Sequence, residues 1–123
     1  MKFQSDSETT VQDLKELMAE FVAERDWQQF HSPKNLSMSI AIEAAELMEH
    51  FQWITHQQSR ELKPDAVAEV SEELADIICY AVSVANEMGI DIASCMSNKM
   101  KKNRLKYPAE EFKGRFGHNA PRS

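Results

Sequence analysis

Apolar residues recur every three or four positions in four stretches of the chain, which is the spacing of an amphipathic helix. These stretches cover residues 10–26, 35–53, 64–88 and 91–106. No stretch shows the strict alternation of apolar and polar residues that marks a half-buried strand. The pattern therefore predicts an all-α fold of the four-helix-bundle type.

Residues with known terminal preferences mark the expected helix ends. Thr10 is a suitable N-cap for the first helix. Pro33 disfavours helix at the preceding residue and predicts a loop between the first and second helices. The third helix is expected to begin at Pro64 or Asp65 and to end before Gly89, because proline suits the first turn and glycine the position after the end.

Each expected helix carries an apolar face. On the second helix this face consists of Leu36, Ile40, Leu47 and Phe51, and on the third of Val70, Leu74, Ile77, Ile78, Ala81, Ala85 and Met88. The long, flexible methionines are expected to fill the core or a subunit interface, and they are Met18, Met38, Met48, Met88, Met96 and Met100. So much apolar surface on four short helices argues against a monomer.

The remaining segments lack periodicity. Residues 54–63 are polar and predict a loop, and residues 112–123 predict a mobile tail. A chain of 123 residues has the length of one ordinary domain. We therefore expect a flexible N-terminus at residues 1–9, one domain at residues 10–108 and a mobile C-terminal segment at residues 109–123.

Composition narrows the class of protein. The net charge of −6 disfavours binding to a nucleic-acid polymer, because the phosphate backbone would be repelled. Cys79 and Cys95 form no CxxC pair, so we expect both to be buried thiols in a reducing compartment. The N-terminal residues contain no apolar signal region, and no apolar run approaches the ~20 residues that span a bilayer. These features predict a cytoplasmic protein with no membrane contact.

Two pairs of acids stand on the two middle helices. Glu43 and Glu46 are three positions apart on the second helix, and Glu73 and Asp76 have the same spacing on the third. Glu43 lies only roughly 40° from the centre of its apolar face, at about 100° per residue. Surface acids that merely pair with nearby lysines would not interrupt an apolar face, so Glu43 indicates a functional role.

Both acidic pairs are displaced from the apolar face in the same rotational sense. A short connection favours antiparallel packing of the two helices, and antiparallel packing brings flanks of equal sense to one side of the interface. Four acids at one rim cannot all stay ionised without a compensating charge. Oxygen ligands alone select a hard cation, so the spacing predicts a Mg²⁺ site in which Mn²⁺ could substitute.

The ExxE…ExxD pattern, with 26 residues between Glu46 and Glu73, resembles the MazG-like all-α nucleoside triphosphate pyrophosphatases. Four blocks are similar to their dCTP pyrophosphatase branch: AERDWQQFHSPKNL, EAAELMEHFQW, EELADIICY and NKMKKNRLKYP. The resemblance covers residues 11–108. It implies hydrolysis of a nucleoside triphosphate to the monophosphate and pyrophosphate, and a homotetramer built around the two middle helices.

The same resemblance implies roles for individual residues. Glu43, Glu46, Glu73 and Asp76 would hold Mg²⁺ and form the catalytic centre. Three residues on one line of the last helix would meet phosphate and sugar, and these are Lys99, Asn103 and Tyr107. Four aromatic or imidazole side chains would form the base pocket, and these are Trp27, His31, Trp53 and Tyr80. Met18 stands where vertebrate dCTP pyrophosphatases carry a histidine, so a uracil, halogenated or methylated pyrimidine is a further candidate base.

Three alternatives follow from the same residues. A related pyrophosphatase acting on dUTP or another nucleotide would keep the acids and change the pocket. A non-catalytic helical oligomeric module would explain the helices but not Glu43 within an apolar face. A di-iron carboxylate protein would need Glu-x-x-His motifs, and neither acidic pair is followed by a histidine at that spacing.

Overall fold

A computed structural model describes residues 5–115 of the chain. It divides into two compact units, Met1–Ile90 and Asp91–Ser123, and each is considered by itself. The first unit contains α1 (Val11–Glu24), the 3₁₀ helix η1 (Gln28–Phe30), α2 (Pro33–Glu49), α3 (His56–Ser59) and α4 (Pro64–Met88). The second contains α5 (Ile92–Lys106) and α6 (Ala109–Phe112). Residues 5–115 contain helices and no strand, which confirms the all-α prediction.

Side-chain and backbone caps explain where the helices begin and end. Thr10 and Asp13 form a capping box at the start of α1. The Ser32 hydroxyl accepts a hydrogen bond from the Asn35 backbone N–H, and Pro33 occupies the first turn of α2. This helix therefore begins two residues before the predicted Asn35, because proline has no N–H that needs a partner there. Gly89 closes α4 in the left-handed conformation with φ of 63°.

The predicted loop at residues 54–63 is wrong in one detail. It contains α3, a single turn capped by Thr55, whose hydroxyl accepts from the Gln58 backbone N–H. The Gln58 side chain accepts in return from the Thr55 backbone N–H. A capping box can hold one isolated turn without an apolar face, so hydrophobic periodicity does not detect it. In the tail, α6 occupies residues 109–112, and the mobility predicted for residues 116–123 lies outside the described residues.

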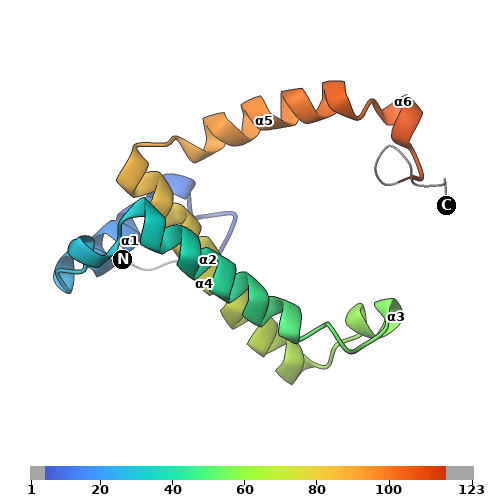
Figure 1. Cartoon of the computed structure of the whole chain (residues 1–123), viewed down its shortest axis with the longest axis horizontal. Coiled ribbons are helices and arrows are strands. Elements are labelled where there is room, and N and C mark those ends of the chain that lie inside the picture. Colours follow the sequence, from blue (N-terminus) through green and yellow to red (C-terminus); the bar gives the residue numbers. More distant parts are fainter. Residues whose placement is uncertain (1–4, 116–123) are drawn as a thin grey trace. The chain divides into compact units, whose positions relative to one another are not determined.

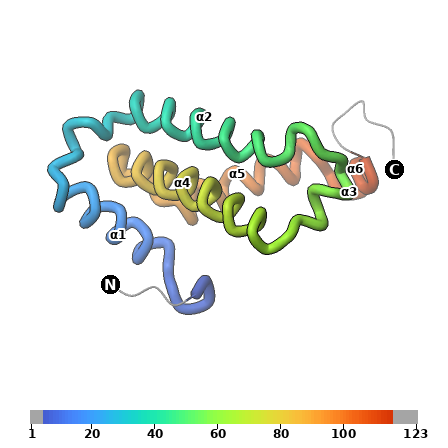
Figure 2. The backbone as a smooth tube through the Cα atoms, turned by 90° about the horizontal axis from the view of Figure 1, so that it is seen from below, coloured from blue at the N-terminus to red at the C-terminus, as the bar shows by residue number. Residues whose placement is uncertain are grey.

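Helices α2 and α4 lie side by side and run in opposite directions, as the two views in Figures 1 and 2 show. This confirms the predicted antiparallel pair. Helix α1 packs against α4 and is tied to its C-terminal end by two long-range hydrogen bonds. Lys15 Nζ donates to the Ile90 carbonyl at 2.6 Å, and Asn86 Nδ2 donates to the Lys15 carbonyl at 3.0 Å.

The core of the chain is small. Within residues 5–115, the buried apolar side chains are Val22, Leu36, Val82 and Ala85. On α4, part of the predicted apolar face is open to solvent, since Leu74 and Ile78 are 47% and 45% exposed. The long apolar side chains are mostly exposed as well, and among the methionines these are Met38, Met48, Met88, Met96 and Met100. These methionines do not fill the core of one chain.

The predicted burial of both cysteines is wrong. Cys79 on α4 is half-buried, but Cys95 on α5 is exposed. Cys95 lies in the first turn of α5, where its thiol donates a hydrogen bond to the Ile92 carbonyl at 3.3 Å. No single helix within residues 5–115 combines the length and apolar character needed to cross a membrane.

Candidate active site

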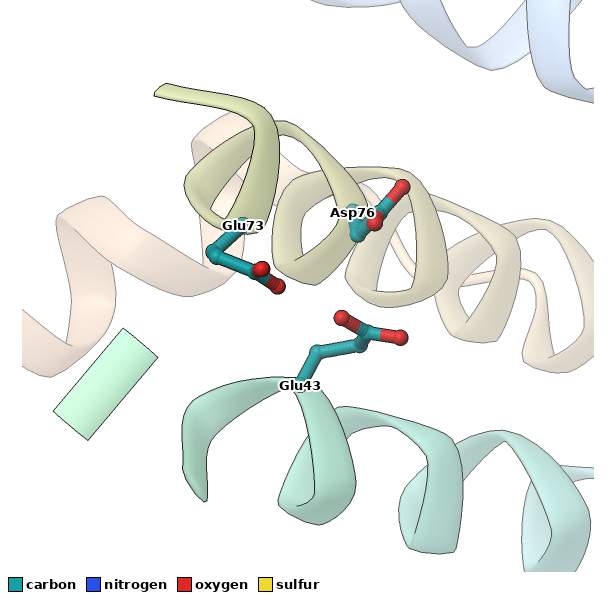
Figure 3. A group of neighbouring side chains, drawn as sticks. All are labelled: Glu43, Glu73 and Asp76. Atoms are coloured by element: carbon teal, nitrogen blue, oxygen red, sulfur yellow. The ribbon is translucent and has the colours of Figure 1, made fainter. Parts of the chain in front are cut away.

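Three of the four predicted acids meet between α2 and α4. Glu43 comes from α2, and Glu73 and Asp76 stand one turn apart on α4. Figure 3 shows the Glu43 carboxylate directed toward the space between the other two. One oxygen from each of the three carboxylates lies within 4.8 Å of the others. The antiparallel packing thus brings Glu43 to two acids that lie at least 30 positions further along the chain.

Glu46 belongs to the same rim but lies outside this group of three. It stands one turn after Glu43 on α2, is half-buried, and contributes to the raised pKa of Glu43. Glu46 is therefore a neighbour of the cluster through Glu43. Its predicted role as a metal ligand stays a prediction.

The crowded carboxyls change the acidity of Glu43. The pKa of Glu43 is raised from 4.5 to about 7, first by a hydrogen bond with Glu46 and then by loss of solvent contact and the Glu46 charge. A hydrogen bond with Glu73 and the charge of Asp76 act in the same direction. Negative charges on these neighbouring carboxyls would repel one another if all of them were ionised. A bound cation would reduce that repulsion.

The donor atoms suit a metal ion. Glu43 Oε2 is buried and has no hydrogen-bond partner within residues 5–115. A buried acceptor without a donor is costly, so a ligand that accepts its lone pairs fits this position. The grouped atoms are all carboxylate oxygens, the donors that hard divalent cations prefer. The cluster can therefore hold a metal ion.

The raised pKa predicts a pH effect on the metal-free protein. Between pH 4.5 and about 7, the folded chain keeps a proton on Glu43 that the unfolded chain has lost. Protonated Glu43 therefore contributes to the stability of the folded chain. This contribution is full below pH 4.5 and is lost as pH rises through about 7. In EDTA, we expect Glu43→Gln to melt a few degrees higher than the unmutated chain at about pH 8, with the difference shrinking toward about pH 5.

Glu49→Gln is the matched control for this measurement. Glu49 is an exposed acid on the same helix and lies outside the cluster. Its melting temperature should follow the unmutated chain across the pH range, as measured by circular dichroism. Parallel melting curves for Glu43→Gln and the unmutated chain would contradict the assigned pKa.

A cavity of about 360 Å³ adjoins the acids, because Asp76 lines it. Its other walls come from α1, the segment after α1 and the middle of α4, and they are Leu17, Met18, Phe21, Trp27, His31, Cys79 and Tyr80. The structure thus brings three of the four predicted base-pocket residues together. The apolar wall residues Leu17 and Phe21 were not predicted as site residues, although both lie on the face of α1 that carries Met18.

The aromatic groups of this cavity are suitably placed for a flat ligand. The Trp27 ring stands edge-on to Phe21 at 5.6 Å and lies 6.4 Å from the His31 ring. Trp27 is 42% exposed, which leaves part of its surface available for stacking. Burial, followed by the charges of Glu43 and Asp76, raises the pKa of the Tyr80 phenol. Tyr80 therefore stays protonated at neutral pH and can donate a hydrogen bond.

Trp53 does not line this cavity. It follows the end of α2 and is 87% exposed, so it is not a core residue of this chain. Its predicted contact with the base stays a prediction.

The three predicted phosphate-binding residues belong to the second unit. Lys99 is exposed, and Asn103 is half-buried with its side-chain amide 3.7 Å from the Met100 sulfur. Tyr107 caps α5, and its ring packs edge-on against Phe112 at 5.2 Å. Their predicted role with phosphate and sugar stays a prediction.

The structure adds one polar residue that the sequence argument missed. His50 at the end of α2 lies 3.8 Å from Glu73, measured between Nε2 and Oε1. A signal was available, because His50 follows Glu46 by four positions and so continues the acidic flank of α2.

The chain is similar to proteins of a known family. Residues 38–116 match the MazG-like family. The dCTP pyrophosphatase 1 of Bos taurus is 40% identical over 114 residues, which make up 91% of this chain and 68% of that protein. The chain belongs to the MazG-like family. The Homo sapiens dCTP pyrophosphatase 1 is also 40% identical, over 88% of this chain and 65% of its own length.

A solved structure supports the same family assignment. A pyrophosphatase from Archaeoglobus fulgidus superposes with a TM-score of 0.75 at 34% identity, covering 88% of this chain and 98% of the archaeal chain. The MazG-like assignment and the enzyme class predicted with it, nucleoside triphosphate pyrophosphohydrolase, are thereby confirmed.

Proposed function

We propose that this MazG-like protein hydrolyses a pyrimidine deoxynucleoside triphosphate, dCTP or a base-modified relative, to the monophosphate and pyrophosphate with Mg²⁺. The observation that carries the proposal is the contact between acids and cavity. Asp76 belongs both to the carboxylate cluster and to the wall of the cavity that holds Trp27 and Tyr80. One ligand can therefore place a triphosphate at the acids and a base in the cavity. The names of the mammalian relatives favour dCTP.

In this proposal, Mg²⁺ would be held by Glu43, Glu73 and Asp76, with Glu46 beside them. The ion would neutralise triphosphate charge and polarise the attacked phosphorus. Ionised carboxylates orient a water molecule whose oxygen forms the new bond to phosphorus. The bond joining the α- and β-phosphates breaks, pyrophosphate leaves, and the proton of the water passes to a carboxylate or to solvent. Mn²⁺ is expected to substitute, because it accepts the same oxygen donors.

The proposal is tested by measuring pyrophosphate release from canonical and modified ribo- and deoxynucleoside triphosphates, each with Mg²⁺ and with EDTA. We expect Mg²⁺-dependent release, with dCTP or a 5-substituted pyrimidine as the best substrate. A clear preference for dUTP would overturn the base assignment and keep the chemistry. No release from any triphosphate would overturn the proposed function.

The base pocket is proposed to include Trp53. A stacked aromatic ring contributes about 1–3 kcal/mol to binding a base. That contribution is present before and during the reaction, so Trp53→Ala should raise KM by roughly fivefold or more while kcat changes less. Steady-state kinetics with the best triphosphate measures both constants. An unchanged KM would remove Trp53 from the pocket.

We propose a homotetramer with α2 and α4 at its centre. Large apolar side chains on these two helices are exposed in the single chain, and they include Met38, Ile42, Met48, Leu74 and Ile78. Exposed large apolar side chains of this kind are typical of subunit interfaces when they gather on one surface. Light scattering coupled to size-exclusion chromatography should give four times the mass of the chain. The mass of a monomer at micromolar concentration would contradict the assembly.

We propose that the protein is cytoplasmic. Cys79 and Cys95 are both free thiols, which supports a reducing compartment such as the cytoplasm.

A further inference from the structure

His50 bridges α2 and α4 beside the acidic cluster. It is the C-cap residue of α2, and its two ring nitrogens face two carboxylates of α4. Nε2 lies 3.8 Å from Glu73 Oε1, and Nδ1 lies 3.9 Å from Glu69 Oε2. Glu69 and Glu73 stand four positions apart, so they form neighbouring rungs on one side of α4. The imidazole therefore fits between two successive turns of the opposite helix.

The two contacts differ in their exposure to solvent. The side chains of His50 and Glu73 are 25% and 22% exposed, whereas that of Glu69 is 69% exposed. The contact with Glu73 is therefore the one better shielded from solvent. Glu69 contacts the other ring nitrogen from the solvent side. This contact can restrict rotation of the imidazole ring.

The ring is not part of the cation site itself. The grouped oxygens of Glu43, Glu73 and Asp76 are mutually within 4.8 Å, and His50 contributes no atom to this group. Of these three acids, Glu73 is the one that lies close to a ring nitrogen of His50. The geometry thus places His50 behind one carboxylate of the cluster.

We propose that His50 is a positioning residue that orients the Glu73 carboxylate toward the divalent cation, with Glu69 holding the imidazole from the other side. The inference rests on the proposed function, since it assigns Glu73 to the metal. A carboxylate side chain loses rotational freedom when a second group contacts it, which lowers the entropic cost of binding the ion. Outer partners of this kind change metal affinity by about 10–100-fold when they are removed.

Direct metal binding to the full chain tests the proposal. Mn²⁺ affinity is measured by electron paramagnetic resonance, and Mg²⁺ and Co²⁺ affinity by calorimetry, for the unmutated chain, His50→Ala and His50→Gln. We expect His50→Ala to bind Mn²⁺ and Mg²⁺ about 10–100-fold more weakly. His50→Gln keeps a hydrogen-bond donor of similar length and should recover most of the affinity. His56→Ala is the matched control, because His56 is an exposed histidine on α3 outside the cluster and the adjoining cavity.

Activity measured across a metal titration adds a second readout. His50→Ala should need about 10–100-fold more Mg²⁺ for half-maximal turnover, while kcat at saturating Mg²⁺ stays close to that of the unmutated chain. Unchanged metal affinity in a folded His50→Ala would overturn the proposal, and so would an equal loss in His50→Ala and His50→Gln. A loss of Co²⁺ affinity far larger than that of Mg²⁺ would also overturn it, because it would identify the imidazole as a direct ligand.

The two proposals fail separately. If the unmutated chain hydrolyses no triphosphate, the proposed function fails, yet the binding comparison still decides whether His50 supports the cation site. If His50→Ala does not fold by circular dichroism, Glu69→Gln takes its place, since it leaves the imidazole and removes only the charge behind it. Metal affinity in folded Glu69→Gln equal to that of the unmutated chain would then contradict the positioning role.

Discussion

Glu73→Ala should abolish triphosphate hydrolysis while the chain stays helical. Glu73 lies in the carboxylate cluster with Glu43 and Asp76 and is more buried than a typical surface acid, at 22% exposed. Its removal takes away one of three closely grouped oxygen donors and the more buried of the two carboxylates that His50 contacts. Losing one electrostatic contact to the reacting phosphate typically costs about 10²–10³-fold, and losing a metal ligand should cost at least as much.

Glu72→Ala is the control for this substitution. Glu72 is the preceding residue on α4, is exposed, and lies outside the cluster. It should keep nearly full activity, because an exposed surface acid contributes little to stability or binding. Pyrophosphate release and circular dichroism on both variants make the comparison. Retained turnover in a soluble, helical Glu73→Ala would remove Glu73 from the catalytic centre.

The second large effect is expected at Trp27. Its ring forms a wall of the cavity that Asp76 also lines, and it is held edge-on by Phe21. Stacking of a base on an aromatic ring contributes about 1–3 kcal/mol, which corresponds to about 5–150-fold in affinity. Trp27→Ala should therefore raise KM for the best triphosphate by that factor. Trp27→Phe keeps an aromatic face and should recover part of the loss.

Phe30→Ala is the matched control for Trp27→Ala. Phe30 is a nearby aromatic residue of η1 that is 58% exposed and does not line the cavity. Its KM should match that of the unmutated chain in the same steady-state assay. An equal rise of KM in both variants would indicate a general disturbance of this segment, and no rise in either would move the base away from Trp27.

Helix positions followed closely from local sequence features. Thr10, Ser32 and Asp91 each accept a hydrogen bond from a backbone N–H three residues later, and Gly89 takes the left-handed conformation that ends α4. Such caps depend only on residues within one turn of each other, so they can be predicted from neighbours in the chain. The short helix α3 was not predicted, because its capping box needs no apolar face.

The acidic cluster was partly accessible from the sequence. Spacing by three positions places Glu73 and Asp76 on adjacent turns, and the interruption of an apolar face identified Glu43. The step from two flanks to one rim required an assumed antiparallel pair, which the structure confirms in Figure 2. The distances within the cluster depend on how far one helix slides and rotates against the other. A residue pattern does not specify that register, so the separation of Glu46 from the group of three became visible only in the fold.

By itself, the sequence determined the helical class, most of the helix ends and, through resemblance, the MazG-like family. These features are encoded by contacts between near neighbours or by motifs carried in one segment. Only the tertiary structure decided that Asp76 joins the acids to the cavity, that Cys95 is exposed, and that His50 faces Glu73. Each of these depends on side chains from different elements meeting in space, and on how much of each helix the neighbouring helices cover.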